Sequence, residues 1–141
     1  MVNIPGSNAP DKDFELHLKN CGKPFGIGTT RDAYSIPCCN NKIIKVSKVP
    51  SNMTNWAELV IFHGLIEKSL FGEIFSWSES GKYLVMERLD DINVKELSGF
   101  SVPFWWDDKK PSNLGRSSTG EIKIRDYGLL KFDPDRSFKF P

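Results

Sequence analysis

Two pairs of β-strand patterns, one on each side of a helix pattern, constrain most strongly what this chain can fold into. Residues 25–36 begin with a pair of glycines and continue with β-branched and aromatic side chains, and residues 41–49 mix β-branched side chains with lysines, so together they predict a hairpin. Residues 72–80 and 82–89 repeat this pattern around a single glycine. Between the pairs, residues 54–70 place apolar side chains at helical spacing, which predicts an amphipathic helix. The order predicts an α+β fold in which an antiparallel sheet carries one helix.

The rest of the chain has shorter and weaker patterns. VKELSGF (94–100) fits one short helical turn, SVPFWW (101–106) is apolar and extended, and residues 121–132 open with the alternation of a strand. Residues 1–12 combine prolines and a glycine with polar neighbours, so we expect a flexible arm there. A length of 141 residues is that of one domain, and we expect a single domain over 13–141.

The composition argues against several classes of function. The chain has 19 basic and 18 acidic side chains and a net charge of +1, whereas nucleic-acid or membrane binding would favour a clear basic excess. No apolar run approaches the ~18 residues of a membrane-spanning helix, and the polar start lacks a signal-peptide core. Three cysteines, two of them adjacent, make a poor disulfide framework, and two histidines without a Cys-x-x-Cys pair offer no zinc-type spacing. We therefore expect a cytoplasmic protein that binds neither nucleic acid nor membrane.

The polar stretch DDKKPSNLG (107–115) is the first candidate site. Taken alone it is most simply a solvated turn, because charged residues with proline and asparagine are common in surface loops. However, it contains Asp108 and Asn113, and Asp126 follows 13 residues after Asn113 in the triplet DYG. Phosphoryl transfer needs this combination, since one aspartate orients the attacking hydroxyl while an asparagine and a second aspartate hold Mg²⁺ against the phosphates.

In its order of motifs the chain resembles the protein-kinase-like superfamily over about residues 22–132. FGIGTTRDAY resembles the glycine-rich loop that covers the phosphates of ATP, with Gly26 and Gly28 allowing close approach of the backbone. Lys45 in NKIIKV takes the place of the lysine that contacts phosphate. Glu58, on the helix that follows, takes the place of the glutamate that pairs with this lysine. The resemblance implies a kinase-like fold that binds ATP and Mg²⁺.

The later motifs fit the same resemblance. KYLVMERL resembles the strand that leads into the adenine-binding hinge, with Met86 as the gatekeeper and backbone groups of Glu87 and Leu89 available to adenine. In DDKKPSNLG, Asp108 takes the place of the catalytic base and Lys110 that of a phosphate-contacting lysine. The resemblance also implies a pair of Mg²⁺ ligands, Asn113 and Asp126.

Some side chains depart from the family pattern. Arg31 stands where a third loop glycine is usual, which should make the loop less pliant, and Ile43 stands where an alanine usually packs on adenine. Trp106–Asp107 replaces the usual His-Arg pair before the catalytic aspartate, so control through that arginine is not expected. The family's stack of apolar side chains between two lobes is matched by Phe62, Trp106 and Tyr127, which would equally be ordinary core aromatics.

The largest departure is one of length. Only 22 residues separate Met86 from Asp108, roughly half of what full kinases use, and only 13 residues follow Gly128. The resemblance therefore implies a minimal, truncated kinase-like protein, of a compact type associated with phages or mobile elements. Its N-lobe and hinge would span 13–89, and a strongly reduced C-lobe would span 90–141.

Two functions remain open on this basis. The first is an ATP- and Mg²⁺-dependent phosphotransferase acting on a protein or a small molecule, because the polar catalytic positions are all present. The second is a non-catalytic, pseudokinase-like module that acts by occupying a partner protein, for example a host protein. FSVPFWW (100–106) bears on the second function, since it is either an apolar interface, which an oligomer would also cover, or the filling of a small core. The core-filling alternative is slightly favoured.

Overall fold

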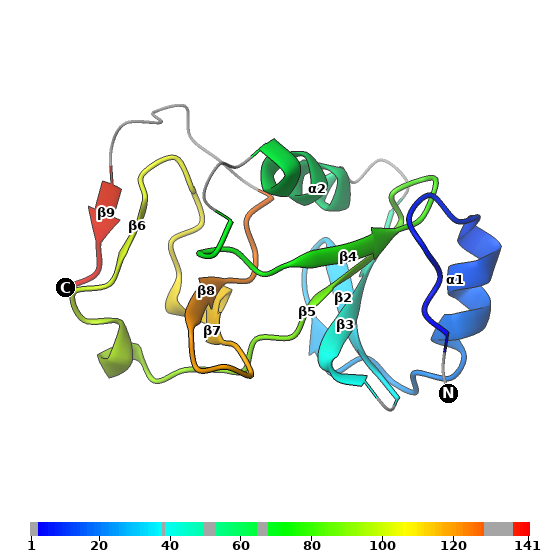
Figure 1. The fold of residues 1–141 in the computed structure, drawn as a ribbon, viewed down its shortest axis with the longest axis horizontal. Helices are drawn as coiled ribbons and strands as arrows, with labels where there is room; N and C mark the ends of the chain where they lie inside the picture. Colours follow the sequence, from blue (N-terminus) through cyan, green and yellow to red (C-terminus); the bar gives the residue numbers. More distant parts are fainter. Residues whose placement is uncertain (1–2, 38, 50–52, 65–67, 129–136) are drawn as a thin grey trace.

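The computed structural model describes residues 3–37, 39–49, 53–64, 68–128 and 137–141. Its largest element is a five-stranded antiparallel sheet in the order β1-β2-β3-β5-β4 (Figure 1). The strands are β1 (Gly26–Ile27), β2 (Arg31–Ile36), β3 (Cys39–Ser47), β4 (Ile74–Trp77) and β5 (Tyr83–Glu87). Both expected hairpins are present, as β2–β3 and β4–β5, and the pairing of β3 with β5 joins them into one sheet.

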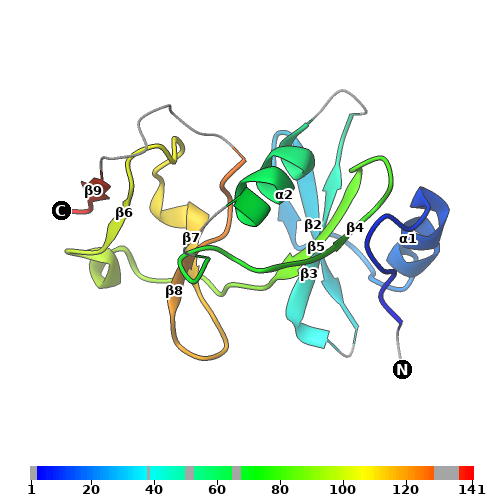
Figure 2. The same ribbon diagram turned by 45° about the horizontal axis from the view of Figure 1, so that its top comes forward.

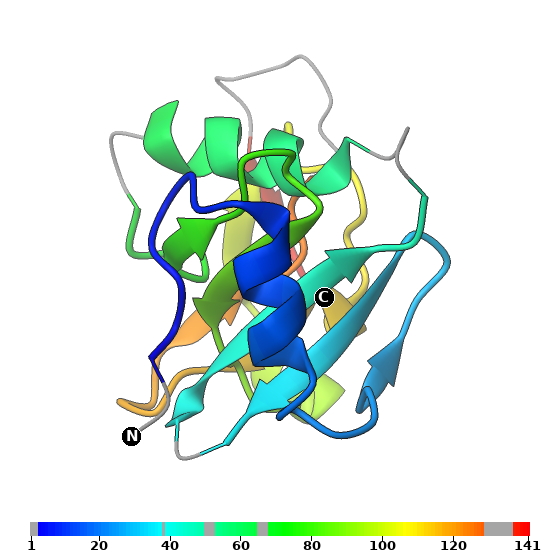
Figure 3. The ribbon, with the colours of Figure 1, turned by 90° about the vertical axis from the view of Figure 1, so that its right-hand side faces the viewer.

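The sheet packs against one helix on each face (Figure 3). The helices are α1 (Asp11–Leu18), on the face that presents Ile44, and α2 (Thr54–Gly64), on the face that presents Ile43. Successive residues of a strand point to opposite faces, so Lys45 shares the α2 face with Ile43. The register of β3 therefore directs Lys45 toward the buried face of α2, where it contacts Glu58 in the candidate site.

The chain before the sheet differs from the expected arm. The backbone amide of Asn8 donates a hydrogen bond of 2.9 Å to the carbonyl of Trp77 in β4. In α1 the ring of Phe14 is fully buried and stacks on Tyr83 at 5.6 Å between ring centroids. The sequence pattern did not predict α1, because a helix of eight residues with few apolar side chains shows too little periodicity.

Three expectations fall partly outside the described residues. Of the expected helix over 54–70, α2 accounts for 54–64, and residues 65–67 are not described. The expected strand over 121–132 is described only to 128, and its regular part covers 122–124. Cys21 and Cys39 are free thiols, and Cys38 is not described.

The second part of the chain consists of short elements. They are η1 (Val94–Leu97), β6 (Ser101–Pro103), η2 (Pro111–Asn113), β7 (Leu114–Arg116), β8 (Ile122–Ile124) and β9 (Ser137–Lys139). The expected helical turn at VKEL is η1, which starts at a capping box formed by Asn93 and Glu96. β7 pairs with β8, β6 pairs with β9, and the β7–β8 hairpin lies between the sheet and the β6–β9 pair (Figure 2). The polar loop of the candidate site therefore leads into a hairpin beside the sheet.

The segment FSVPFWW packs into the core. Val102 and Trp106 are buried, Phe100 and Trp105 are partly buried, and Trp105 stacks on Phe71 at 5.6 Å between ring centroids. This packing supports the core-filling alternative, while self-association stays a prediction. No helix among the described residues is both long and apolar enough to cross a membrane.

The Tyr83 phenol leads to a prediction about alkaline pH. Burial first, and then the acidic side chains of Glu15 and Asp11, raise the pKa of Tyr83 to about 12, above the ~10 of an unfolded chain. The folded state then retains a proton that the unfolded state loses, so this group's stabilisation is complete below about pH 10 and is lost as the pH rises toward 12. We expect the thermal midpoint to fall between about pH 10 and pH 12 less steeply in Tyr83→Phe than in the wild type. Parallel curves from differential scanning calorimetry would contradict this expectation.

Candidate functional site

A cleft of about 500 Å³ lies between the sheet and the second part of the chain. Its walls come from the β1–β2 turn, from β3, from the segment after β5 and from the polar loops next to β7 and β8. Most of the site residues expected from the sequence line it, namely Gly26, Gly28, Lys45, Glu87, Leu89, Asn113 and Asp126. Ala33, Ile43 and Leu89 form an apolar part of the wall. Segments far apart in the sequence therefore meet at one concave site.

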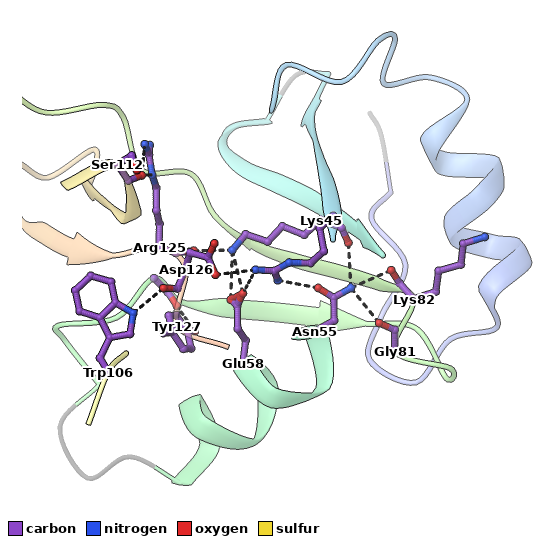
Figure 4. A network of polar contacts seen from close by, with 12 residues as sticks. Lys45, Asn55, Glu58, Gly81, Lys82, Trp106, Ser112, Arg125, Asp126 and Tyr127 are labelled. Carbon is purple, nitrogen blue, oxygen red and sulfur yellow. Dashed lines mark hydrogen bonds and ion pairs between the residues drawn. The ribbon is translucent and has the colours of Figure 1, made fainter. Parts of the chain in front are cut away.

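Lys45 and Glu58 form a buried ion pair next to this cleft (Figure 4). The Lys45 ammonium donates to both carboxylate oxygens of Glu58, at 3.2 and 3.3 Å, and to the backbone carbonyl of Arg125 at 2.5 Å. Glu58 is fully buried on α2. Burial first, and then the nearby Arg31 guanidinium, lower the pKa of Lys45, while Glu58 and Asp126 act in the opposite direction. The lysine is thus positioned by fold contacts before any ligand arrives.

Arg31 occupies the centre of the same network. Its side chain is 7% exposed and forms ion pairs with Glu58 and, at 3.0 Å, with Asp126. It also donates a hydrogen bond of 2.9 Å to the side-chain oxygen of Asn55 on α2. From the sequence alone, Arg31 is notable only because it stands where the glycine-rich loop usually has a third glycine. Strand parity could have identified it, because Arg31, Ala33 and Lys45 share the α2 face through the pairing of β2 with β3.

Asp126 is held in place from behind by two buried aromatic residues. The indole of Trp106 donates to the backbone carbonyl of Asp126 at 2.8 Å. The hydroxyl of Tyr127 donates to the carbonyl of Gly72 at 2.9 Å, and its ring meets Phe71 edge-on. Phe62 belongs to the same core cluster as both aromatic residues, as the expected apolar stack requires. The carboxylate of Asp126 therefore projects from a rigid backbone and is itself 44% exposed.

Of the three expected site residues in the polar loop 107–115, one lines the cleft and two do not. Asn113 lines the cleft and donates a hydrogen bond of 2.9 Å to the backbone carbonyl of Asp108. Asp108 and Lys110 do not line the cleft, and they pair with one another at 3.4 Å on a partly exposed surface. Lys109 folds back and donates to the carbonyls of Phe104 and Trp106. The loop is thus anchored with the expected catalytic base outside the cleft.

Arg125 is a site residue that the sequence pattern did not reveal. Its guanidinium donates to the carbonyl of Leu89 at 2.7 Å, to Asp91 at 2.6 Å and to the carbonyl of Ser112 at 3.0 Å. It fastens the segment after β5 to the polar loop, so both walls of the cleft hold their positions together. The Leu89 carbonyl, which the sequence leads us to expect near adenine, therefore accepts one hydrogen bond from Arg125 and has a second lone pair available. Nothing in the local sequence around Arg125 signals this role.

One of the two expected Mg²⁺ ligands, Asp126, already pairs with a cation in this arrangement. One carboxylate oxygen of Asp126 already accepts from Arg31, and a guanidinium stays charged at any ordinary pH. A divalent ion at Asp126 would therefore sit beside a fixed positive charge. Among the described residues, no group of three or more His, Cys, Asp or Glu side chains is arranged to hold a metal ion.

Comparison with solved structures supports a kinase-like fold. The apo structure of a pseudokinase matches this chain with a TM-score of 0.58 at 11% sequence identity, over 94% of this chain and 66% of that chain. The chain thus spans just under two thirds of the length of that solved chain. No family model matches the chain, and no curated protein matches it in sequence. At this identity the likeness concerns the fold alone: an antiparallel sheet with two helices, compatible with a small kinase-like N-lobe.

Proposed function

We propose that this chain binds an adenine nucleotide such as ATP in the cleft and acts as a non-catalytic, kinase-like module that occupies a partner protein. In this proposal residues 90–141 are a strongly reduced C-lobe. The observation that carries the proposal is the buried Lys45–Glu58 pair, which positions a cation in the wall of the cleft. The positive charge of Lys45 suits the negatively charged phosphates of a nucleotide. The apolar side chains of Ala33, Ile43 and Leu89 suit its planar base.

Two observations favour binding without phosphotransfer. The expected catalytic base, Asp108, pairs with Lys110 outside the cleft. Asp126, the expected metal ligand, is paired with Arg31. Catalysis of phosphoryl transfer depends on an aligned base and on metal ions at the phosphates, whereas here the expected base pairs with Lys110 and the expected metal ligand pairs with Arg31. The solved structure with a similar fold is that of a pseudokinase, which is consistent with this proposal.

An ATP- and Mg²⁺-dependent phosphotransferase is the second candidate function. The presence of Phe62, Trp106 and Tyr127 in one core cluster is compatible with it, since the resemblance implies a stack of apolar side chains at these places. This candidate requires Asp108 to align with an acceptor hydroxyl and Asp126 to hold a metal ion beside Arg31. Radiolabelled ATP with Mg²⁺ tests it directly. Turnover that is lost in Asp108→Ala would establish it, and the absence of any transfer or hydrolysis is the result that we expect.

A thermal shift experiment tests nucleotide binding. At one hundred times its dissociation constant, ATP should stabilise the folded state by about 2.7 kcal/mol, which raises the midpoint by several degrees in a domain of this size. We expect Lys45→Ala to remove most of this shift, because the cation in the cleft wall is lost. The matched control is Lys95→Ala, an exposed lysine of η1 outside the cleft, which should keep the full shift. Equal shifts in the two variants would disprove the assigned role of Lys45.

A further inference from the structure

We infer that Arg31 takes the place of a divalent cation in this cleft, so that the nucleotide binds without Mg²⁺. The inference rests on the proposed nucleotide binding and specifies the form of the ligand, which is free ATP or ADP rather than the magnesium complex. It follows from the contacts of Arg31, from the charges around the cleft and from the ion pair between Asp126 and Arg31.

Arg31 is built into its position rather than resting on a surface. Its guanidinium contacts Asn55, Glu58 and Asp126, and the side chain is almost entirely buried. Asn55 is itself fixed, since its amide donates to the carbonyls of Lys45, Gly81 and Lys82 at 2.9–3.3 Å. A buried arginine held by a buried and satisfied asparagine cannot move away without breaking several hydrogen bonds. The positive charge is therefore a permanent part of the site.

The charges of the inner site are already balanced without a metal ion. Arg31 and Lys45 are the two cations, and Glu58 and Asp126 are the two anions. Burial first, and then the charge of the Arg31 guanidinium, lower the pKa of Lys45. A divalent ion at Asp126 would add two further positive charges to this pair. Bound phosphates would instead meet the guanidinium of Arg31 and the ammonium of Lys45, both of which are held in place by these carboxylates.

The other acidic side chains of the cleft also have basic partners. Asp91 pairs with Arg125 at 2.6 Å, Glu87 with Lys123 at 2.9 Å and Asp32 with Lys48 at 3.4 Å. Among the described cleft residues, every carboxylate thus has a cation within 3.4 Å. A metal ion that bound one of these carboxylates would therefore lie close to a basic side chain.

Arg31 also has the right chemistry to receive phosphate. A guanidinium carries five N–H donors, and the three acceptors that it contacts here leave capacity for a phosphate oxygen. Arginine binds phosphate oxygens through charge-assisted and often paired hydrogen bonds. Because Arg31 lines the cleft next to Gly28, a phosphate beneath the glycine turn would lie within its reach.

Isothermal titration calorimetry with ATP, in excess EDTA and in excess Mg²⁺, tests the inference. For the wild type we expect dissociation constants that agree within about threefold in the two buffers. In Arg31→Gln we expect binding in EDTA to weaken by about tenfold or more, as for the loss of one charged hydrogen bond, and Mg²⁺ to restore it. The matched control is Arg116→Gln, which removes the same charge from an exposed side chain on β7 and should behave like the wild type.

A second variant keeps the test decisive if Arg31→Gln fails to fold. Asp126→Asn removes the charge of the only expected carboxylate ligand and leaves Arg31 in place, so we expect ATP binding in EDTA to persist and Mg²⁺ to have no effect. Wild-type binding that appears only with Mg²⁺, and is abolished by Asp126→Asn, would overturn the inference while leaving nucleotide binding intact. If the wild type binds ATP in neither buffer, the proposed function is wrong and the inference fails with it.

Discussion

Glu58→Ala is expected to lower the free energy of unfolding by about 3–5 kcal/mol. Glu58 is fully buried and forms ion pairs with both Arg31 and Lys45. Without its carboxylate the two buried cations repel one another, and only Asp126, which is partly exposed, still opposes their charge. Breaking a buried ion pair on one side costs more than the pair contributes, because the remaining charge stays desolvated. Since a domain of this kind is stable by only about 5–15 kcal/mol, the variant should be close to unfolding.

Urea unfolding followed by tryptophan fluorescence measures this effect. Glu121→Ala is the matched control, because its carboxylate is 61% exposed and lies 3.8 Å from Lys123. An exposed pair of this kind contributes about 0–1 kcal/mol, so the control should unfold near the wild-type midpoint. Glu58→Gln should fall between the two, since the amide keeps the volume and an acceptor but loses the charge. A cost below about 1 kcal/mol for Glu58→Ala would mean that the site tolerates two unpaired cations, contrary to the buried network described above.

The sheet and the helix that packs on it could be predicted because local periodicity carries them. The β-strand patterns predict the strand that contains Lys45, and the helical spacing predicts the helix that contains Glu58, whereas the contact between these two side chains was implied only by the resemblance in the order of motifs. Both periods are properties of a few neighbouring residues, so they appear in sequence without knowledge of the tertiary structure. Chain order then supplied the rest, because a helix between two hairpins packs most simply across the sheet that they form.

The rest of the site depends on contacts between segments far apart in the chain. Arg31 reaches Asp126 across 95 residues and Arg125 reaches Leu89 across 36, and no local pattern marks either pair. The displacement of Asp108 from the cleft similarly depends on how Lys109 and Asn113 anchor the loop. A motif match assigns residue types to positions, but it does not determine which hydrogen bonds those residues make. Here these bonds are the reason why, of the two functions that the sequence leaves open, we propose the binding module.

Trp106→Ala is the second change with a large expected effect. Trp106 is fully buried in the cluster that joins α2 to the second part of the chain, and its indole donates to the carbonyl of Asp126. Removing a buried indole leaves a large cavity and typically costs about 3–5 kcal/mol. Trp77→Ala is the matched control, since that indole is only partly buried on β4 and pairs with Asn8. Chemical unfolding followed by far-UV circular dichroism avoids the loss of a fluorescent probe, and equal costs for the two variants would contradict the central role of Trp106.

Trp106→Phe separates the packing role of this residue from its role in positioning Asp126. Phenylalanine keeps most of the apolar volume but cannot donate to the Asp126 carbonyl, and an unsatisfied buried carbonyl costs about 1–3 kcal/mol. The folded variant should then hold Asp126 less firmly, which weakens the Arg31–Asp126 pair and frees the carboxylate for other cations. We therefore expect ATP binding in Trp106→Phe to respond to Mg²⁺ where binding by the wild type does not. A Phe variant that is destabilised but remains insensitive to Mg²⁺ would show that Arg31 alone, and not the fixed backbone behind Asp126, keeps the metal out.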